Sequence, residues 1–149
     1  MLGLDVGDAR IGVAISDPLG MFAQPLVSLE RKNELAVSEV VKLVEEHAVS
    51  IVVIGLPLEL NGNEGEQAKK VKTFAAKLKG GLEQSPANQT NLFFWDERLT
   101  TVQAERVIAG SGLKNRARRE ALDRISAAII LESFLHSRQH LAPELEPQE

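Results

Sequence analysis

One short segment limits what this chain can fold into more than any other feature, because it is apolar at every position. Residues 51–55 read Ile-Val-Val-Ile-Gly, so neither side of a strand formed there would favour water. Burial on both faces is typical of central, parallel strands in sheets that helices cover on both sides. The segment therefore predicts an α/β fold.

Segments of alternating polarity predict the other strands. Residues 2–7 and 10–17 place aliphatic side chains on one face and small residues on the other, and the short connection between them favours an antiparallel hairpin. The face of small residues would let another element approach the strand backbone closely. Residues 24–30 and 91–96 are the two further strands that we expect.

Helices are expected between and after these strands. The first would be capped at Asn33, with Leu35 on its inward face, and a lysine-rich helix would end near Gly80. A helix opening at Thr100 would precede the last one, which we expect from about Arg118 to His136.

This order of elements predicts a single α/β domain over residues 1–139, with a mixed five-stranded sheet flanked by helices. The remaining end, residues 140–149, is acidic and contains proline, and we expect it to be disordered.

The composition excludes several classes of protein. Cysteine is absent, which rules out disulfides, thiolate metal sites and cysteine nucleophiles. No apolar run approaches the roughly 18 residues of a membrane-spanning helix, and no export signal is visible. We therefore expect a cytoplasmic protein without membrane contact, in which any metal is held by oxygen ligands or by one of three histidines.

Net charge constrains the partner less, because the charges are unevenly distributed. The chain carries −4 at pH 7, but the acids after Pro143 account for three of these charges. Residues 66–79 and 114–124 carry local net charges of +4 and +3. Such patches can bind backbone phosphates, and solvated helix faces produce the same pattern, so both interpretations stay open.

Three acids occupy positions that suggest more than solvation. Asp5 lies in a predicted strand between glycines, where a charge is costly, although it could also cap the next turn. Glu97 follows a strand at the end where parallel sheets bind ligands, or it stabilises the entry to a helix. Asp123 heads an apolar helical stripe and so faces the sheet, although the helix dipole also favours acids near a helix start.

These acids come from a first strand, a later strand end and the final helix, so they could meet at one rim of the sheet. Clustered carboxylates repel one another unless cations lie among them, and oxygen ligands favour Mg²⁺ or Mn²⁺. That arrangement is typical of metal-assisted phosphodiester hydrolysis.

Several motifs, taken in order, resemble one family. Gly-Leu-Asp-Val-Gly surrounds Asp5, Arg-Ile-Gly-Val-Ala starts at Arg10, Gly-Leu-Pro-Leu occupies 55–58, Asp-Glu-Arg-Leu-Thr-Thr occupies 96–101, and Asp123 closes the series. These blocks resemble the YqgF (RuvX-like) family over residues 2 to about 138. The resemblance implies a ribonuclease H-like fold and a metal-dependent nuclease. The family is named both for Holliday junction resolution and for maturing the 5′ end of pre-16S ribosomal RNA.

The resemblance also implies which residues act. The family's acidic triad corresponds to Asp5, Glu97 and Asp123, and we hypothesise that Asp5 bridges two ions while each of the others completes one coordination shell. Phosphates of the nucleic acid would be held by Arg10 near the hairpin and by a basic run that is otherwise only a solvated linker: Lys114, Arg116, Arg118 and Arg119. We interpret Phe93, Phe94 and Trp95 as strand core, so recognition would depend on backbone and shape.

Other functions remain open at this stage. The substrate could be pre-rRNA or branched DNA, and the protein a monomer or a homodimer, although symmetric cleavage of a junction requires the dimer. A non-catalytic factor on the same fold could bind RNA or protein. The spacing of Asp5 and Gly7 also resembles a phosphate loop of actin-like phosphotransferases, which need two such domains and therefore a longer chain.

Overall fold

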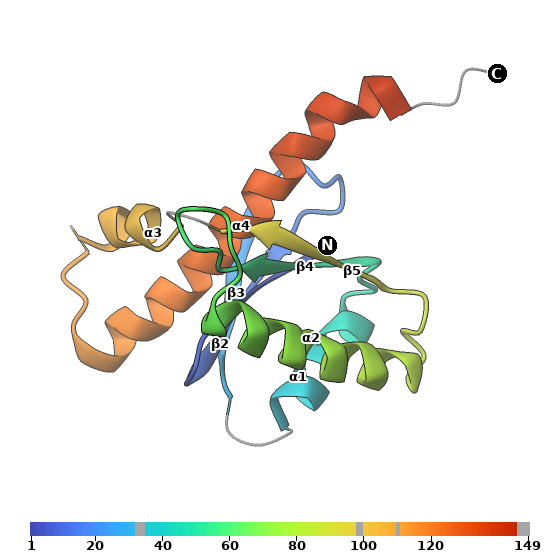
Figure 1. The fold of residues 1–149 in the computed structure, drawn as a ribbon, viewed down its shortest axis with the longest axis horizontal. Coiled ribbons are helices and arrows are strands. Elements are labelled where there is room, and N and C mark those ends of the chain that lie inside the picture. The colour runs from blue at the N-terminus through green and yellow to red at the C-terminus, as the bar shows by residue number, and fades with distance from the viewer. Residues whose placement is uncertain (32–34, 98–99, 110, 146–149) are drawn as a thin grey trace.

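A five-stranded mixed sheet organises the computed structural model, which describes residues 1–31, 35–97, 100–109 and 111–145 (Figure 1). The strand order is β3-β2-β1-β4-β5. Strands β1 and β2 form the predicted antiparallel hairpin, and β3 pairs antiparallel with β2. Strand β4 pairs parallel with β1, and β5 pairs parallel with β4. The strands are β1 (Leu2–Val6), β2 (Arg10–Ser16), β3 (Ala23–Glu30), β4 (Ile51–Leu56) and β5 (Asn91–Asp96).

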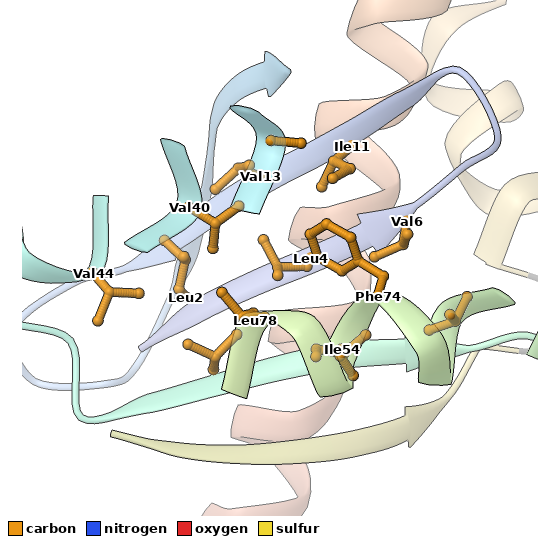
Figure 2. Packing of buried hydrophobic residues seen from close by; sticks show 14 of the residues in the cluster. Leu2, Leu4, Val6, Ile11, Val13, Val40, Val44, Ile54, Phe74 and Leu78 are labelled. Atoms are coloured by element: carbon orange, nitrogen blue, oxygen red, sulfur yellow. The ribbon is translucent and has the colours of Figure 1, made fainter. Parts of the chain in front are cut away.

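Helices cover both faces of this sheet, as the apolar segment at 51–55 predicts. On one face, α1 (Leu35–Glu46) and α2 (Glu66–Glu83) enclose the main core, in which Leu4 and Ile54 are fully buried (Figure 2). On the other face, α4 (Asn115–Leu145) packs across β1, β2, β3 and β4, and its Ile130 and Leu131 lie on the sheet. The short α3 (Thr100–Ile108) packs against α4. The prediction of an α/β fold is confirmed.

Small residues in the sheet bring the α4 backbone unusually close. A Cβ atom at Gly12 would lie 1.9 Å from the carbonyl oxygen of Asp123, and one at Gly3 would lie 2.9 Å from that of Ala127. Side chains at these positions would therefore separate the helix from the strands. Helix α4 packs on the face of small residues that was predicted for the hairpin.

Three predictions about individual elements were wrong. Leu35 is exposed instead of facing inward. Phe93 and Phe94 are 45% and 44% exposed, because β5 is the last strand of the sheet and has a neighbour on one side only. The last helix is also longer than predicted, since it begins at Asn115.

The far end of that helix bears on the expected tail. Helix α4 continues to Leu145, so residues 140–145 are helical where we expected disorder, while residues 146–149 lie outside the described residues. The predicted cap at Asn33 also lies outside them. The domain boundary at residue 139 stays a prediction. In the part of the chain that the structure describes, no helix has the length and apolar character needed to cross a membrane.

Candidate active site

Two of the three predicted acids meet where parallel strands end. Asp5 lies near the end of β1, and Glu97 directly follows β5, with its backbone N–H donating to the carbonyl oxygen of Leu56 at 3.3 Å. Gly55 on the intervening β4 makes room for the meeting, since a Cβ there would lie 2.7 Å from Oε2 of Glu97. The carboxyl end of the parallel strands therefore forms one acidic rim, as ligand sites in such sheets do.

The two carboxyl groups are close enough to share a hydrogen bond, and this changes their protonation. Burial, followed by the negative charge of Asp123, raises the pKa of Asp5 to about 6. Burial, followed by the charge of Asp5 and the hydrogen bond between them, raises the pKa of Glu97 to about 8. At neutral pH the pair therefore holds one proton between two carboxylates that would otherwise repel each other.

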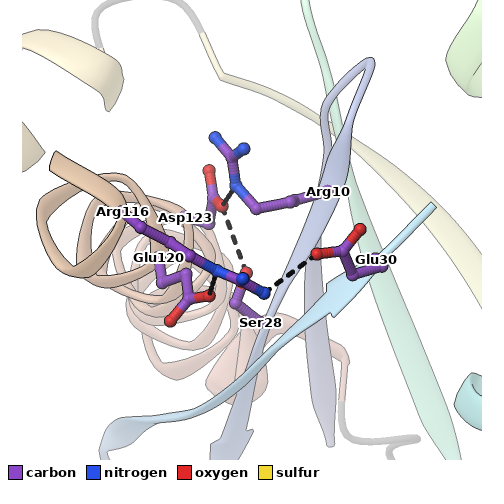
Figure 3. Close-up of polar contacts among 6 residues, drawn as sticks. All are labelled: Arg10, Ser28, Glu30, Arg116, Glu120 and Asp123. Carbon is purple, nitrogen blue, oxygen red and sulfur yellow. Dashed lines mark hydrogen bonds and ion pairs between the residues drawn. The ribbon is translucent and has the colours of Figure 1, made fainter.

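The third acid, Asp123, is near enough to influence Asp5 but has other partners. Its Oδ2 accepts hydrogen bonds from Nε of Arg10 at 2.6 Å and from Oγ of Ser28 at 3.1 Å (Figure 3). The side chains of Arg10 and Asp123 are only 26% and 17% exposed, so this ion pair is partly enclosed. Among the described residues, no three acidic or histidine side chains are gathered tightly enough to hold a metal ion.

The chemistry of these donors nevertheless fits a divalent cation. The site offers carboxylate oxygens, which Mg²⁺ and Mn²⁺ prefer, and burial beside other carboxyl groups raises the pKa of both Asp5 and Glu97. Close approach of a cation would favour the ionised forms of Asp5 and Glu97 and release the proton that the pair holds. The residues present are therefore suited to a metal, with Arg10 as the local competitor for Asp123.

The predicted phosphate-binding residues divide into two groups. Arg10 is paired with Asp123, and Arg116 is paired with Glu120 at 2.8 Å and with Glu30 at 3.1 Å. The other three are exposed: Lys114 just before α4, and Arg118 and Arg119 in its first turns. Most of the basic run is therefore helical and is not a linker. Contact of these residues with nucleic acid stays a prediction.

Two contributors to the site were not found in the sequence. Ser28 lies opposite Gly12 in the register of β2 and β3, and Gly12 in turn lies opposite Asp5, so the three share one row across the sheet. This row could have pointed to Ser28, but only once the register of β3 was known. Gly55 belongs to the Gly-Leu-Pro-Leu motif, although its role beside Glu97 is evident only from the folded structure.

The raised pKa of Glu97 gives a testable dependence of stability on pH. The pKa of Glu97 is higher in the folded than in the unfolded state, so protonation of this side chain stabilises the fold. The contribution is complete below about pH 4.5 and is lost as the pH rises towards 8. Glu97→Gln should therefore be more stable than the wild type at pH 8, by on the order of 2 kcal/mol or about 4–8 °C. The difference should shrink at pH 4.5. Thermal unfolding at both pH values without metal checks this, with the exposed Glu83→Gln as control; an offset independent of pH would contradict it.

Comparison with known proteins shows which family this chain resembles. A family model described as RuvX, Holliday junction resolvase, matches residues 1–137. A protein of Clostridium novyi (strain NT) named "Putative pre-16S rRNA nuclease" is 41% identical over 138 residues, which cover 92% of this chain and 98% of the relative. A protein with the same name from Caldanaerobacter subterraneus subsp. tengcongensis is 42% identical over 142 residues, covering 94% and 98%.

The fold has solved counterparts. The structure of Thermus thermophilus RuvC in complex with Holliday junction substrate has a TM-score of 0.56 to this chain, at 12% identity, with 93% of this chain and 96% of that chain covered. At this identity the likeness shows the fold alone, which is the ribonuclease H-like fold that we predicted. The matches to the family model and to the relatives extend over nearly the whole domain, and they show that this chain belongs to the RuvX family.

Proposed function

We propose that this protein is a metal-dependent nuclease that hydrolyses phosphodiester bonds of structured nucleic acid. The observation that carries the proposal is the acidic rim, where the carboxyl groups of Asp5 and Glu97 are within hydrogen-bonding distance of each other and close to Asp123, on a ribonuclease H-like sheet. A structural acid has no need of such neighbours, whose mutual repulsion costs stability. Perturbed acids that converge in this way are typical of catalytic sites.

The proposed metal ligands are Asp5, Glu97 and Asp123. When bound there, Mg²⁺ or Mn²⁺ would activate water and stabilise the leaving oxygen. The protein contributes the positions of the acids: Asp5 is fixed by β1, Glu97 by the end of β5, and Asp123 by the packing of α4 on Gly12. Because these acids lie on different elements, the tertiary fold sets their spacing.

We further propose that the preferred substrate is pre-16S ribosomal RNA, which is in the names of the relatives that cover 92–94% of this chain, and that cleavage falls in its 5′ leader. Such a role belongs in the cytoplasm, where we expect this protein. The second candidate is a four-way DNA junction, which is named in the description of the family model. It requires two sites related by symmetry, so it also requires a homodimer.

Phosphate contacts by the start of α4 predict a particular dependence on salt. Binding through phosphates releases counterions, so log K falls as log salt concentration rises. Each lost contact makes this negative slope shallower by somewhat less than one. The double variant Arg118→Gln/Arg119→Gln should therefore reduce the steepness of this slope by roughly 1 to 2. Fluorescence anisotropy with a labelled leader RNA measures it. Lys42→Gln/Arg138→Gln, on exposed positions outside both basic segments, is the matched control. Equal slopes for both double variants would contradict phosphate binding by this part of α4.

The function itself is tested on one panel of substrates. The panel contains a pre-16S rRNA leader, a four-way DNA junction and plain duplexes, each with Mg²⁺, with Mn²⁺ and with a chelator. Cleavage of the leader alone, dependent on metal, supports rRNA maturation, and symmetric cleavage of the junction by a dimer supports the resolvase. Binding without any cleavage would overturn the nuclease and favour a non-catalytic RNA-binding factor.

A further inference from the structure

The arginine at the start of β2 has a partner that its position in the sequence does not suggest. Arg10 follows the hairpin turn, where a free guanidinium could face a phosphate, yet its Nε donates to Oδ2 of Asp123 at 2.6 Å. That oxygen also accepts from Ser28 (Figure 3), so both of its lone pairs are used. The carboxylate is thereby held by one charged and one neutral donor.

The backbone beneath this carboxylate has little freedom to move. The carbonyl oxygen of Asp123 lies against Gly12, where there is no space for even a Cβ. Oδ2 of Asp123 can therefore change partners only by rotation of the Asp123 side chain, or if Arg10 leaves. The first of these would break the bond to Ser28 as well, whereas the second would leave it intact.

Charge balance shows what the arginine does in this state. Asp123 lies near Asp5, and Asp5 lies against Glu97. The guanidinium of Arg10 offsets one of these negative charges, which is the role that a bound cation would otherwise have. Arg10 and a divalent ion at Asp123 would repel each other at short range, so the two positive charges compete for one carboxylate.

We propose that Arg10 is an exchangeable counter-ion, which pairs with Asp123 when the site holds no metal and moves to a backbone phosphate of the nucleic acid when it does. The idea rests on the proposed function, since it supplies a specific use for one residue of that site. Exchange couples the two ligands: metal frees Arg10 for the phosphate, and the phosphate draws Arg10 away from the metal ligand. Metal and nucleic acid should therefore each strengthen the binding of the other.

The first test measures Mg²⁺ binding to the protein without nucleic acid, by isothermal titration and by the rise in melting temperature. Arg10→Gln should bind Mg²⁺ at least about fivefold more tightly than the wild type, because the competitor is gone. Lys42→Gln is the matched control, because it removes an exposed positive charge from α1 on the other face of the sheet; it should stay near the wild-type value. Arg10→Lys keeps the charge and should also stay near it, which separates loss of charge from altered packing.

The second test measures coupling to nucleic acid, with a labelled leader RNA and Ca²⁺ in place of Mg²⁺ to suppress cleavage. In the wild type, Ca²⁺ should raise RNA affinity, and in Arg10→Gln most of that gain should disappear. Mg²⁺ affinity in Arg10→Gln that is equal to or weaker than in the wild type would overturn the exchange while leaving the nuclease intact. Wild-type protein that binds no Mg²⁺ at all would overturn both.

Discussion

Asparagine in place of Asp5 is expected to lower the rate of phosphodiester cleavage by at least about a thousandfold. Asp5 contacts Glu97 and lies near Asp123, so it is the member of the acidic rim through which the other two interact. The variant keeps the shape of the side chain but removes the charge that a divalent cation would need. Single-turnover cleavage of the best substrate on the panel measures the loss.

Asp8→Asn is the matched control for this variant. Asp8 lies three residues further along, in the exposed hairpin turn, where it accepts from Gln67 and Lys70 and touches none of the three acids. Its cleavage rate should stay within about twofold of the wild type, since exposed pairs of this kind contribute little. The melting temperature of Asp5→Asn should not fall, because the substitution relieves repulsion. Near wild-type cleavage by Asp5→Asn would remove Asp5 from the proposed mechanism.

Alanine in place of Gly12 is expected to have the largest effect on stability. The new methyl group would lie 1.9 Å from the carbonyl oxygen of Asp123, and both groups belong to backbones that cannot rotate away. Either β2 or α4 must shift, which should cost about 3 kcal/mol or more. For a domain of this size the melting temperature should fall by about 6–12 °C.

Gly80→Ala provides the opposite expectation from the same change. Gly80 lies in α2 with no atom near the place of a Cβ, so alanine should raise helix propensity and stabilise the fold by about 0.5–1 kcal/mol. Thermal unfolding of both variants gives the comparison. Any Gly12→Ala protein that remains folded should also show a weaker Mg²⁺-induced rise in melting temperature, because Asp123 would be displaced. A Gly12→Ala protein as stable as the wild type would contradict the close packing of α4.

Local patterns in the sequence were sufficient for the strands and for the three acids. Alternation along β1 placed Asp5 on the face of small residues, and the apolar stripe below Asp123 placed that acid against the sheet. Both inferences need only the period of a strand or a helix. The meeting of Asp5 and Glu97 follows because parallel strands end at the same edge of the sheet. That Asp123 acts with them stays a prediction.

What the sequence could not provide were facts about the edge of the sheet and about distant pairs. Phe93 and Phe94 are apolar enough for a core, and only the strand order shows that β5 has a single neighbour. The bond between Arg10 and Asp123 joins residues 113 positions apart, and nothing local to either indicates the other. An arginine expected to face phosphate is thus paired with an acid.

The packing of α4 on the sheet has a consequence for folding during synthesis of the chain. This helix is the last element in chain order, yet it covers one face of the sheet and supplies Asp123. During synthesis from the N-terminus, Ala14 and Val53 lack this cover, and Asp123 is missing, until α4 is made. The proposed metal site therefore stays incomplete until α4 has been made and has packed on Gly12.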